Sequence, residues 1–263
     1  MKNILLLVHD DVGQEARLQA ALDLTRAVSG HLNCVDVSQM PVVFADDGYA
    51  GAMLLDDERE REAANRQRLE TRLANEDIAW DWVDVTDSIA EAVIGAAGLA
   101  DLIVLNRRLD AFPAPDMRGI AGAILMEVRK PVVAVPDNLR GFKITGRALV
   151  AWDGLPAVTA TMQSCVPLLQ LASEVELITV QESGDEPDAE EAASYLSRHG
   201  VHPGIRSLGR GPADELIARE CATGGADWCL LGAYGHGRLR ELLFGGVSRR
   251  LLTESPIPLI LGH

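Results

Sequence analysis

Short apolar runs alternate along the chain with longer segments of helical spacing. In the first half, Ile4–Val8 and Leu32–Val37 are apolar enough to form strands, and Gln14–Val28 between them has the spacing of a helix. The run Asp101–Leu105 is almost continuously apolar, as expected of a strand that is covered on both faces. Strands that alternate with helices predict a parallel sheet with right-handed crossovers.

The remaining segments of the first half extend this alternation. We predict a charged helix at Asp56–Asn75, a strand at Ile78–Val85, a helix at Thr86–Ala100 with Thr86 as its N-cap, a helix at Gly119–Lys130 and a strand at Pro131–Pro136. The charged helix is dense in Glu and Arg at i,i+4 spacing, and its apolar face is thin. It is therefore expected to be a solvated helix that covers the sheet or a neighbouring element.

The second half repeats the order of the first. Ala226–Gly232 matches Ala100–Asn106 in pattern, and Ser255–Leu261 matches Lys130–Pro136. Before Ala226, the second half holds predicted strands at 148–152, 175–180 and 205–208 and predicted helices at 158–169, 185–200 and 212–223. The predicted fold class is α/β, with two tandem doubly wound domains at residues 1–140 and 141–263, each holding a five-stranded, mostly parallel sheet.

Composition narrows the classes of partner. The chain is 48% hydrophobic and 24% charged, which is typical of a globular protein. Its net charge of −15 argues against nucleic acid and anionic membranes as partners, because the overall field repels both. The first apolar run is too short for a signal peptide or a membrane span, so we expect a cytoplasmic protein. The four cysteines show no CxxC spacing and are expected to be buried rather than bonded or zinc-binding.

One stretch near the C-terminus, Leu231–Arg250, has the composition of an anion-binding loop. Its glycines let backbone amides approach a ligand closely, and free amides at the start of a helix attract phosphate. The stretch is locally basic in an acidic chain, with Arg238, Arg240, Arg249 and Arg250 against Glu241. Asp153 follows the first strand of the same half, where it could meet a ribose hydroxyl or a metal ion, or simply begin a turn.

The glycine spacing resembles the fingerprint of the universal stress proteins, which is Gly-x2-Gly, nine residues, then Gly followed by Ser or Thr. Gly232 and Gly235 form the first pair, nine residues follow, and Gly245 matches the next position, while Gly246 replaces the hydroxyl residue. The resemblance extends to the strand end Val150–Gly154 and to the terminal strand, and it covers both halves of the chain.

This resemblance implies a site for an adenine nucleotide in the second domain. In nucleotide-binding members the loop holds the phosphates, the aspartate after the first strand lies near the nucleoside, and a valine of the second strand meets adenine. By position these roles fall on Asp153, Val180, Gly232, Gly235, Gly245 and Gly246, and His236, Val247 and Ser248 complete the candidate set. Ser248 could supply the missing hydroxyl, and His236 could contact phosphate or carry a proton, although a solvated loop histidine is the favoured interpretation. AMP, ADP and ATP all fit the pattern, with Mg²⁺ accompanying a triphosphate.

The first half departs from the fingerprint. It reads Asn106-Arg107-Arg108-Leu109-Asp110 at the loop position, without paired glycines, and His9-Asp10-Asp11 after its first strand. Bulky side chains there would obstruct a phosphate, so we expect one nucleotide site per chain. Because family members pair through their last strands, Val132–Val135 and Ile257–Leu261 are expected to pair antiparallel and make the chain an intramolecular pseudo-dimer. A homodimer and an unknown protein partner remain open.

Three functions are compatible with the sequence. The leading one is a stress-response protein that binds an adenine nucleotide and acts as a regulatory or protective module. The alternatives are a protein–protein interaction scaffold with vestigial nucleotide sites and a slow adenine-nucleotide hydrolase. The lysines are Lys2, Lys130 and Lys143, none near the loop, and no G-x-x-x-x-G-K-[ST] motif is present, which excludes a P-loop ATPase. The sequence predicts no catalytic residue and no metal site, and at most slow ATP hydrolysis.

Overall fold

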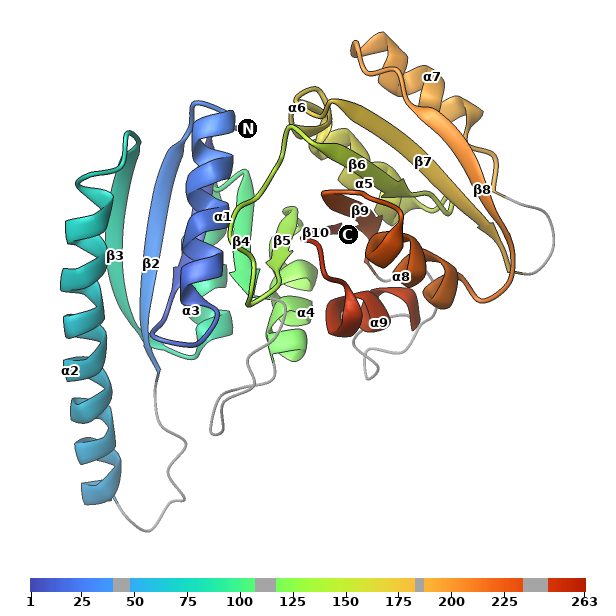
Figure 1. Cartoon of the computed structure of the whole chain (residues 1–263). Coiled ribbons are helices and arrows are strands. Elements are labelled where there is room, and N and C mark those ends of the chain that lie inside the picture. The colour runs from blue at the N-terminus through green and yellow to red at the C-terminus, as the bar shows by residue number, and fades with distance from the viewer. Residues whose placement is uncertain (40–47, 107–116, 183–186, 234–245) are drawn as a thin grey trace.

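The computed structural model describes residues 1–39, 48–106, 117–182, 187–233 and 246–263. Its strands form one ten-stranded sheet in the order β3-β2-β1-β4-β5-β10-β9-β6-β7-β8 (Figure 1). The strands of each half run parallel to one another, as predicted for α/β domains. The two halves have the same strand order, so the predicted fold class is confirmed.

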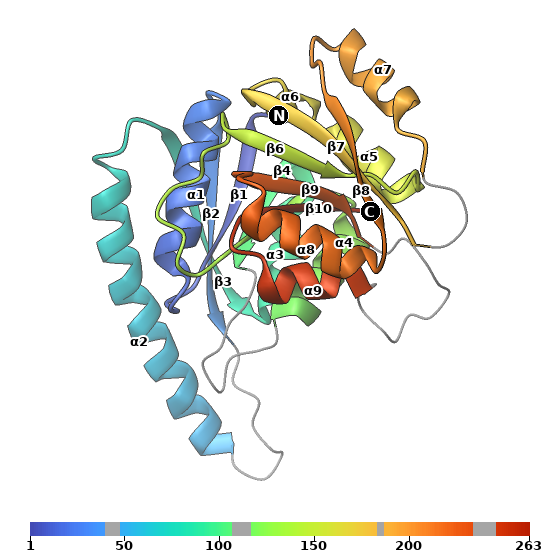
Figure 2. The ribbon, with the colours of Figure 1, turned by 45° about the vertical axis from the view of Figure 1, so that its right-hand side comes forward.

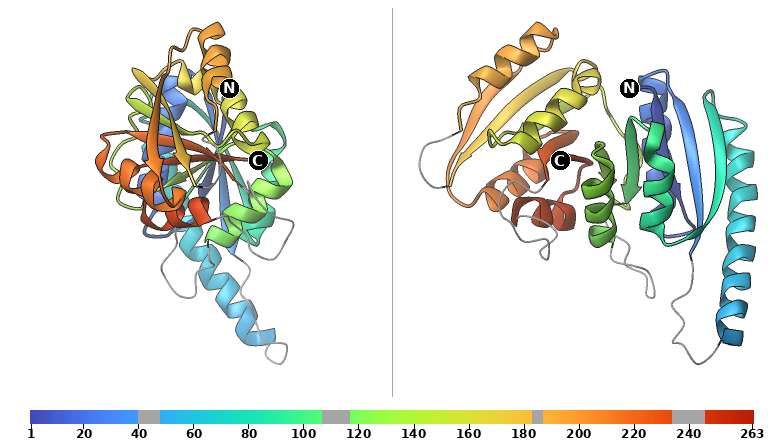
Figure 3. Two further views of the ribbon diagram at one scale, coloured as in Figure 1. Left: turned by 90° about the vertical axis from the view of Figure 1, so that its right-hand side faces the viewer. Right: turned by 180° about the vertical axis from the view of Figure 1, so that it is seen from behind.

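The first half contains five strands and the helices between them. They are β1 (Asn3–Val8), α1 (Gln14–Ala27), β2 (His31–Gln39), α2 (Gly48–Leu73), β3 (Ala79–Asp87), α3 (Ile89–Ala96), the 3₁₀ turn η1 (Ala97–Leu99), β4 (Leu102–Asn106), α4 (Met117–Val128) and β5 (Val132–Val135). The long α2 lies beside β2 and β3 and extends beyond the sheet, as the view from behind shows (Figure 3).

The second half follows the same order with shorter helices. Its elements are β6 (Arg147–Ala151), α5 (Pro156–Ser164), α6 (Val166–Leu169), β7 (Glu174–Gln181), α7 (Glu190–Arg198), β8 (Gly204–Arg210), α8 (Ala213–Thr223), β9 (Trp228–Gly232), α9 (Gly246–Glu254) and β10 (Leu259–Gly262). The segment between β5 and β6 connects the halves, and the domain boundary after residue 140 stays a prediction.

The last strands of the two halves join them into one sheet. Leu259 pairs with Ala134 and Leu261 with Val132, and the pairing is antiparallel. All four residues are fully buried. The predicted pairing of the two terminal strands is therefore confirmed, and each covers an edge that the other half would leave open.

Helices cover both faces of the sheet and give the molecule two apolar cores. One core packs α1, α2, α5, α6 and α7 against the sheet. The other packs α3, α4, α8 and α9 against the opposite face, and Figure 2 shows α8 and α9 together over β9 and β10. All four cysteines lie in described segments, and each is buried with a free thiol. Within the described parts of the chain, no helix has both the length and the apolarity required to cross a bilayer.

Three local predictions need correction. Thr86 is not the N-cap of α3, because β3 continues to Asp87 and the hydroxyl of Ser88 accepts the hydrogen bond from the Glu91 amide. The predicted helix at 158–169 is interrupted at Cys165. α5 ends at Ser164, and a second helix, α6, begins at Val166 with Pro167 in its first turn. The charged helix is not simply a solvated surface, since Glu62 and Asn65 of α2 are buried.

A close helix–strand crossing occurs at the carboxyl edge of each half. A Cβ atom on Gly232, at the end of β9, would lie 2.5 Å from the backbone nitrogen of Val158 and 3.0 Å from the carbonyl carbon of Ala157, both in α5. In the first half the glycine is on the helix side, where a Cβ on Gly13 would lie 1.4 Å from Nδ2 of Asn106 at the end of β4. The space beside Gly232 is therefore taken by helix backbone, whereas the space beside Gly13 is taken by the side chain of Asn106.

An ion-pair network joins the strands at the outer end of the second half. The carboxylate of Glu176 on β7 accepts hydrogen bonds from Arg206 on β8 at 2.8 and 2.9 Å and from Arg147 on β6 at 2.8 Å. Arg206 also donates to Glu220 on α8. These bonds, above all those from Arg206, hold the pKa of Glu176 below its ordinary value.

The network predicts a pH-dependent contribution to stability. Glu176→Gln should lower the free energy of unfolding by about 1 kcal/mol at pH 7. Because the folded-state pKa is lowered, this contribution is present above the ordinary pKa of about 4.3 and is lost as pH falls through the lower folded-state pKa. Urea denaturation at several pH values measures the difference. Glu174→Gln, an exposed residue on the same strand, is the control and should change little; equal losses in the two variants would contradict the assignment.

The crossing at Gly232 predicts a steric cost. Gly232→Ala should destabilise the protein by about 1–3 kcal/mol, because the new methyl group meets backbone atoms that cannot move aside. Gly246→Ala is the matched control: no atom of the described residues lies within 4 Å of its added Cβ, so its unfolding midpoint in urea should stay close to that of the wild type. Equal midpoints for all three proteins would refute the close approach.

Candidate functional site

The carboxyl ends of β6, β7 and β9 meet at the edge where the sequence places a ligand. β6 lies between β9 and β7, and the chain leaves β6 toward β7 but later returns on the other side through β9. The strand order therefore reverses between β6 and β9, which is where open α/β sheets bind ligands. Asp153 follows β6 by two residues, and Gly232 is the last residue of β9.

Asp153 is positioned by a tight turn into α5. One of its carboxylate oxygens accepts a hydrogen bond from the amide of Leu155 at 2.9 Å, and Gly154 has a positive φ of 74°. The side chain of Asp153 is exposed. The residue thus has the turn geometry that its position suggested, and it also keeps carboxylate surface accessible to a ligand.

The start of α9 is attached to the end of β9. The hydroxyl of Ser248 is buried and donates to the carbonyl oxygen of Gly232 at 3.5 Å. Gly246, the first residue of α9, is exposed, whereas Val247 is half-buried against the core under α8 and α9. Val180, near the end of β7, packs half-buried against the same core. Of the predicted set, Gly235, His236 and Gly245 lie outside the described residues.

Of the four arginines in the predicted anion-binding stretch, Arg249 and Arg250 are described, and Arg250 is paired with carboxylates. Arg250 on α9 donates to Asp214 on α8 and to Glu254 on its own helix, each at 3.1 Å, and Glu215 lies 3.5 Å away. Three carboxylates thus surround its guanidinium group. Arg249 is exposed on the same helix. Amides at the start of α9, whose first turn holds no acidic residue, are the feature of this end best suited to an anion.

The equivalent edge of the first half is filled by the protein's own side chains. Arg17 of α1 is fully buried and donates to the carbonyl oxygens of Leu7 at 2.6 Å and His9 at 3.0 Å. It also donates to the carboxylate of Asp11 at 2.9 Å and to the side-chain oxygen of Asn106. A buried guanidinium group with this many partners is firmly held. The prediction that side chains obstruct this edge agrees with the geometry.

A second polar group lies beside it, between β1, β2 and α2. We call it the His9 cluster: His9, Asp36, Glu58 and Glu62. The Nδ1 atom of His9 lies 3.0 Å from Oε1 of Glu62, 3.9 Å from Oε1 of Glu58 and 3.1 Å from the carbonyl oxygen of Val37. His9, Asp36 and Glu62 are 5%, 3% and 2% exposed, so three titratable groups share a nearly dry space.

The pKa values within the His9 cluster reflect this crowding. Burial, together with the negative charge of Glu62, raises the pKa of Asp36 to about 8. Burial alone would lower the pKa of His9, but the Glu62, Asp11 and Glu58 carboxylates outweigh it and raise that pKa. Burial alone would raise the pKa of Glu62, but the hydrogen bonds from His9 and the Asp10 amide outweigh it and lower that pKa. Two buried carboxyl groups therefore compete for one positive partner.

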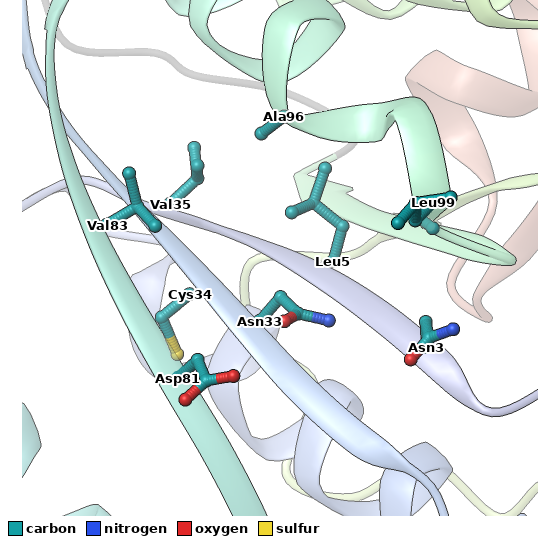
Figure 4. A pocket seen from close by; sticks show the side chains of 10 residues that line it. Asn3, Leu5, Asn33, Cys34, Val35, Asp81, Val83, Ala96 and Leu99 are labelled. Carbon is teal, nitrogen blue, oxygen red and sulfur yellow. The ribbon is translucent and has the colours of Figure 1, made fainter.

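A cavity of about 350 Å³ opens at the other end of the first-half strands (Figure 4). Leu5, Val35, Val83, Ala96 and Leu99 give it a mostly apolar lining, with Asn3, Asn33 and Asp81 at its polar side. These residues belong to the first halves of β1, β2 and β3, to the end of α3 and to η1. The cavity is thus remote from the strand ends where a nucleotide site is expected.

Sequence reasoning missed the His9 cluster. It recognised His9 only as an obstruction after the first strand, and it interpreted Glu58 and Glu62 as part of a solvated charge run. The available signal was that these two glutamates are four residues apart, which places both on one helix face. Nothing in the sequence pattern indicated that this face turns toward β2.

Comparisons with known proteins agree with the fold and the fingerprint. The model of the Universal stress protein family matches residues 146–262. The universal stress protein Slr1230 of Synechocystis is 27% identical over 169 residues, which cover 61% of this chain and 57% of that protein. The likeness thus spans little more than half of this relative's length.

Solved structures extend the likeness of the fold to the whole chain. A universal stress protein from Archaeoglobus fulgidus superposes with a TM-score of 0.78 and 15% identity, covering 99% of this chain and 95% of that one. A structure from Pseudomonas aeruginosa covers 100% and 93%, with a TM-score of 0.61 and 16% identity. At these identities the match concerns the fold of both halves. Residues 146–262 therefore form a domain of the universal stress protein family.

Proposed function

We propose that the second half binds an adenine nucleotide at the carboxyl ends of β6, β7 and β9, and that the bound state regulates a protective or signalling role. Family membership supports a role in the stress response. The observation that carries the nucleotide proposal is the contrast between the halves: Gly232 stands where Asn106 and its partner Arg17 fill the first half. A glycine at this crossing leaves the strand end without a side chain that blocks phosphate.

The described residues suggest how the parts of a nucleotide would be held. The exposed carboxylate of Asp153 is suited to accept hydrogen bonds from ribose hydroxyl groups. Amides at the start of α9, with exposed Gly246 as its first residue, would attract the phosphates. Val180 offers a half-buried apolar surface to the base. AMP, ADP and ATP are all compatible with this division, and Mg²⁺ would accompany the triphosphate.

Hydrolysis has weaker support than binding. Among the candidate residues that the structure describes, Asp153 is the one with a titratable side chain, and it is engaged in the turn before α5. A general base would have to lie within hydrogen-bonding distance of a water molecule beside the terminal phosphate. We therefore propose a binding protein, with slow hydrolysis as the lesser alternative.

The scaffold alternative is supported by the first half. The buried Arg17 and its hydrogen-bond partners fill the strand ends of this half, so polar groups of the protein occupy the position of a ligand site. A domain of this kind can serve as a partner-binding surface for an unknown protein. Under this alternative, neither half would respond to an adenine nucleotide.

Calorimetric titration of the full chain with ATP, ADP and AMP tests the proposal. We expect binding of one nucleotide per chain, weakened about tenfold or more in Asp153→Ala, because a hydrogen bond to a charged group contributes about 1.5–3 kcal/mol. Asp87→Ala is the matched control. It also removes an exposed carboxylate that accepts a backbone amide before a helix, but in the other half, so affinity should not change.

The same titration separates the alternatives. Absence of heat with all three nucleotides at millimolar concentration would refute the proposal and favour the scaffold. Release of phosphate above background, lost in Asp153→Ala, would instead establish the hydrolase.

A further inference from the structure

The His9 cluster has more negative charge than its surroundings compensate. Asp36, Glu58 and Glu62 contribute three carboxylates, and Arg61 contributes one guanidinium group, 2.8 Å from Oε2 of Glu58 and 3.6 Å from Oε1 of Glu62. The neighbouring acidic groups are already paired: Asp10 with Arg68, Asp11 with Arg17 and Asp84 with Arg66. When Asp36 is ionised and His9 is neutral, two negative charges remain, which a divalent cation would balance.

Asp36 provides an independent indication of a ligand. It lies within β2, is 3% exposed, and its Oδ1 atom has no hydrogen-bond partner among the described residues. The carboxyl group lies against Glu62, close enough for the two to share a proton. A buried carboxylate oxygen without a donor is costly. A proton or a cation beside Asp36 would offset this cost.

The donor atoms are spaced for direct coordination. Nδ1 of His9 lies 3.0 and 3.9 Å from the nearest oxygens of Glu62 and Glu58, and the three ligand atoms all lie within 4.8 Å of one another. In a tetrahedral site with metal–ligand bonds of about 2.1 Å, donor atoms are about 3.4 Å apart. A small rearrangement of side chains would therefore place all three donors on one ion.

Supporting contacts hold these donors in place. The Oε1 atom of Glu62 accepts the amide of Asp10 at 3.1 Å, and its Oε2 atom accepts the side-chain amide of Asn65 at 3.2 Å. Arg61 contacts both oxygens of Glu58: it donates to Oε1 at 2.9 Å and lies 2.8 Å from Oε2, which fixes the carboxylate with Oε1 3.9 Å from Nδ1 of His9. Hydrogen-bonded carboxylates of this kind are the usual outer support of metal ligands.

We propose that the His9 cluster binds a divalent transition-metal ion. Coordination would use His9 Nδ1 with one oxygen each from Glu58 and Glu62, and the Asp36 carboxylate would supply the buried charge beside them. An imidazole nitrogen combined with carboxylates favours Zn²⁺ or Mn²⁺ over Mg²⁺ or Ca²⁺, which prefer oxygen ligands alone. The site is in the first half, so it is separate from the nucleotide site proposed above.

Titration of the full chain with Zn²⁺, after removal of metals with EDTA and without nucleotide, tests the proposal. We expect one tight site per chain, with Mg²⁺ binding far more weakly. Glu58→Gln, Glu62→Gln and His9→Gln should each weaken Zn²⁺ binding at least about tenfold. His31→Gln is the matched control. It removes a histidine that also faces a carboxylate, that of Asp81 at 2.9 Å, but on the exposed surface, so affinity at the tight site should persist.

A second measurement guards against variants that fail to fold. In the wild type, Zn²⁺ should raise the thermal midpoint and release protons, seen as a dependence of the binding heat on the ionisation enthalpy of the buffer. Glu58 is the least buried of the three ligands, so Glu58→Gln is the variant expected to fold most securely. Absence of a stoichiometric Zn²⁺ site in the wild type would show that the cluster holds only a proton. Unchanged affinity in folded Glu58→Gln or Glu62→Gln would equally overturn the proposal.

Discussion

The close approach of a helix to a strand end limits what each half of this protein can hold. At the crossing of α5 and β9, a Cβ atom on Gly232 would lie 2.5 Å from a backbone nitrogen, so the strand must end in glycine. At the crossing of α1 and β4, Gly13 makes room for the side chain of Asn106 instead. At this crossing one half packs helix backbone against a strand end without a side chain, and the other places the side chain of Asn106 there. The same strand order can consequently support two different chemistries at the corresponding edge.

The side chains that fill the strand ends of the first half have electrostatic consequences. Arg17 is fully buried and requires acceptors, which Asp11, Asn106 and the carbonyl oxygens of Leu7 and His9 provide. Next to these groups, α2 brings Glu58 and Glu62 against His9, near the carboxylate of Asp36 in β2. Arg17 cannot neutralise them because its own partners occupy it. The negative charge of the His9 cluster is therefore not compensated by Arg17, whose hydrogen bonds are all made at the strand ends.

The sequence predicts the sheet well and the polar interior poorly. Apolar runs define β1, β4 and β9 because strands covered on both faces must be apolar throughout. The pairing of β5 with β10 is implied instead by the resemblance to the universal stress proteins, and it covers two strand edges that would otherwise be exposed. The pattern of apolar residues fails for Glu62 and Asn65, because a charge-rich helix shows no apolar stripe that would reveal its buried face. It also fails at Thr86, where a serine two residues later forms the cap. Of the predicted site, the sequence locates Asp153, Val180 and Gly232 at one edge, whereas the contacts of Ser248 and Arg250 depend on how α9 meets β9 and α8.

The central claim is that the two halves differ in access to their strand ends. Hydrogen–deuterium exchange with and without ADP tests it most directly, because it reports every backbone amide in one experiment. The account predicts slower exchange at residues 152–158, 180–182, 232–233 and 246–250 of the second half, with no change at residues 9–17 and 104–106 of the first. Protection of the first-half segments, or no protection anywhere in the second half at saturating ADP, would contradict it.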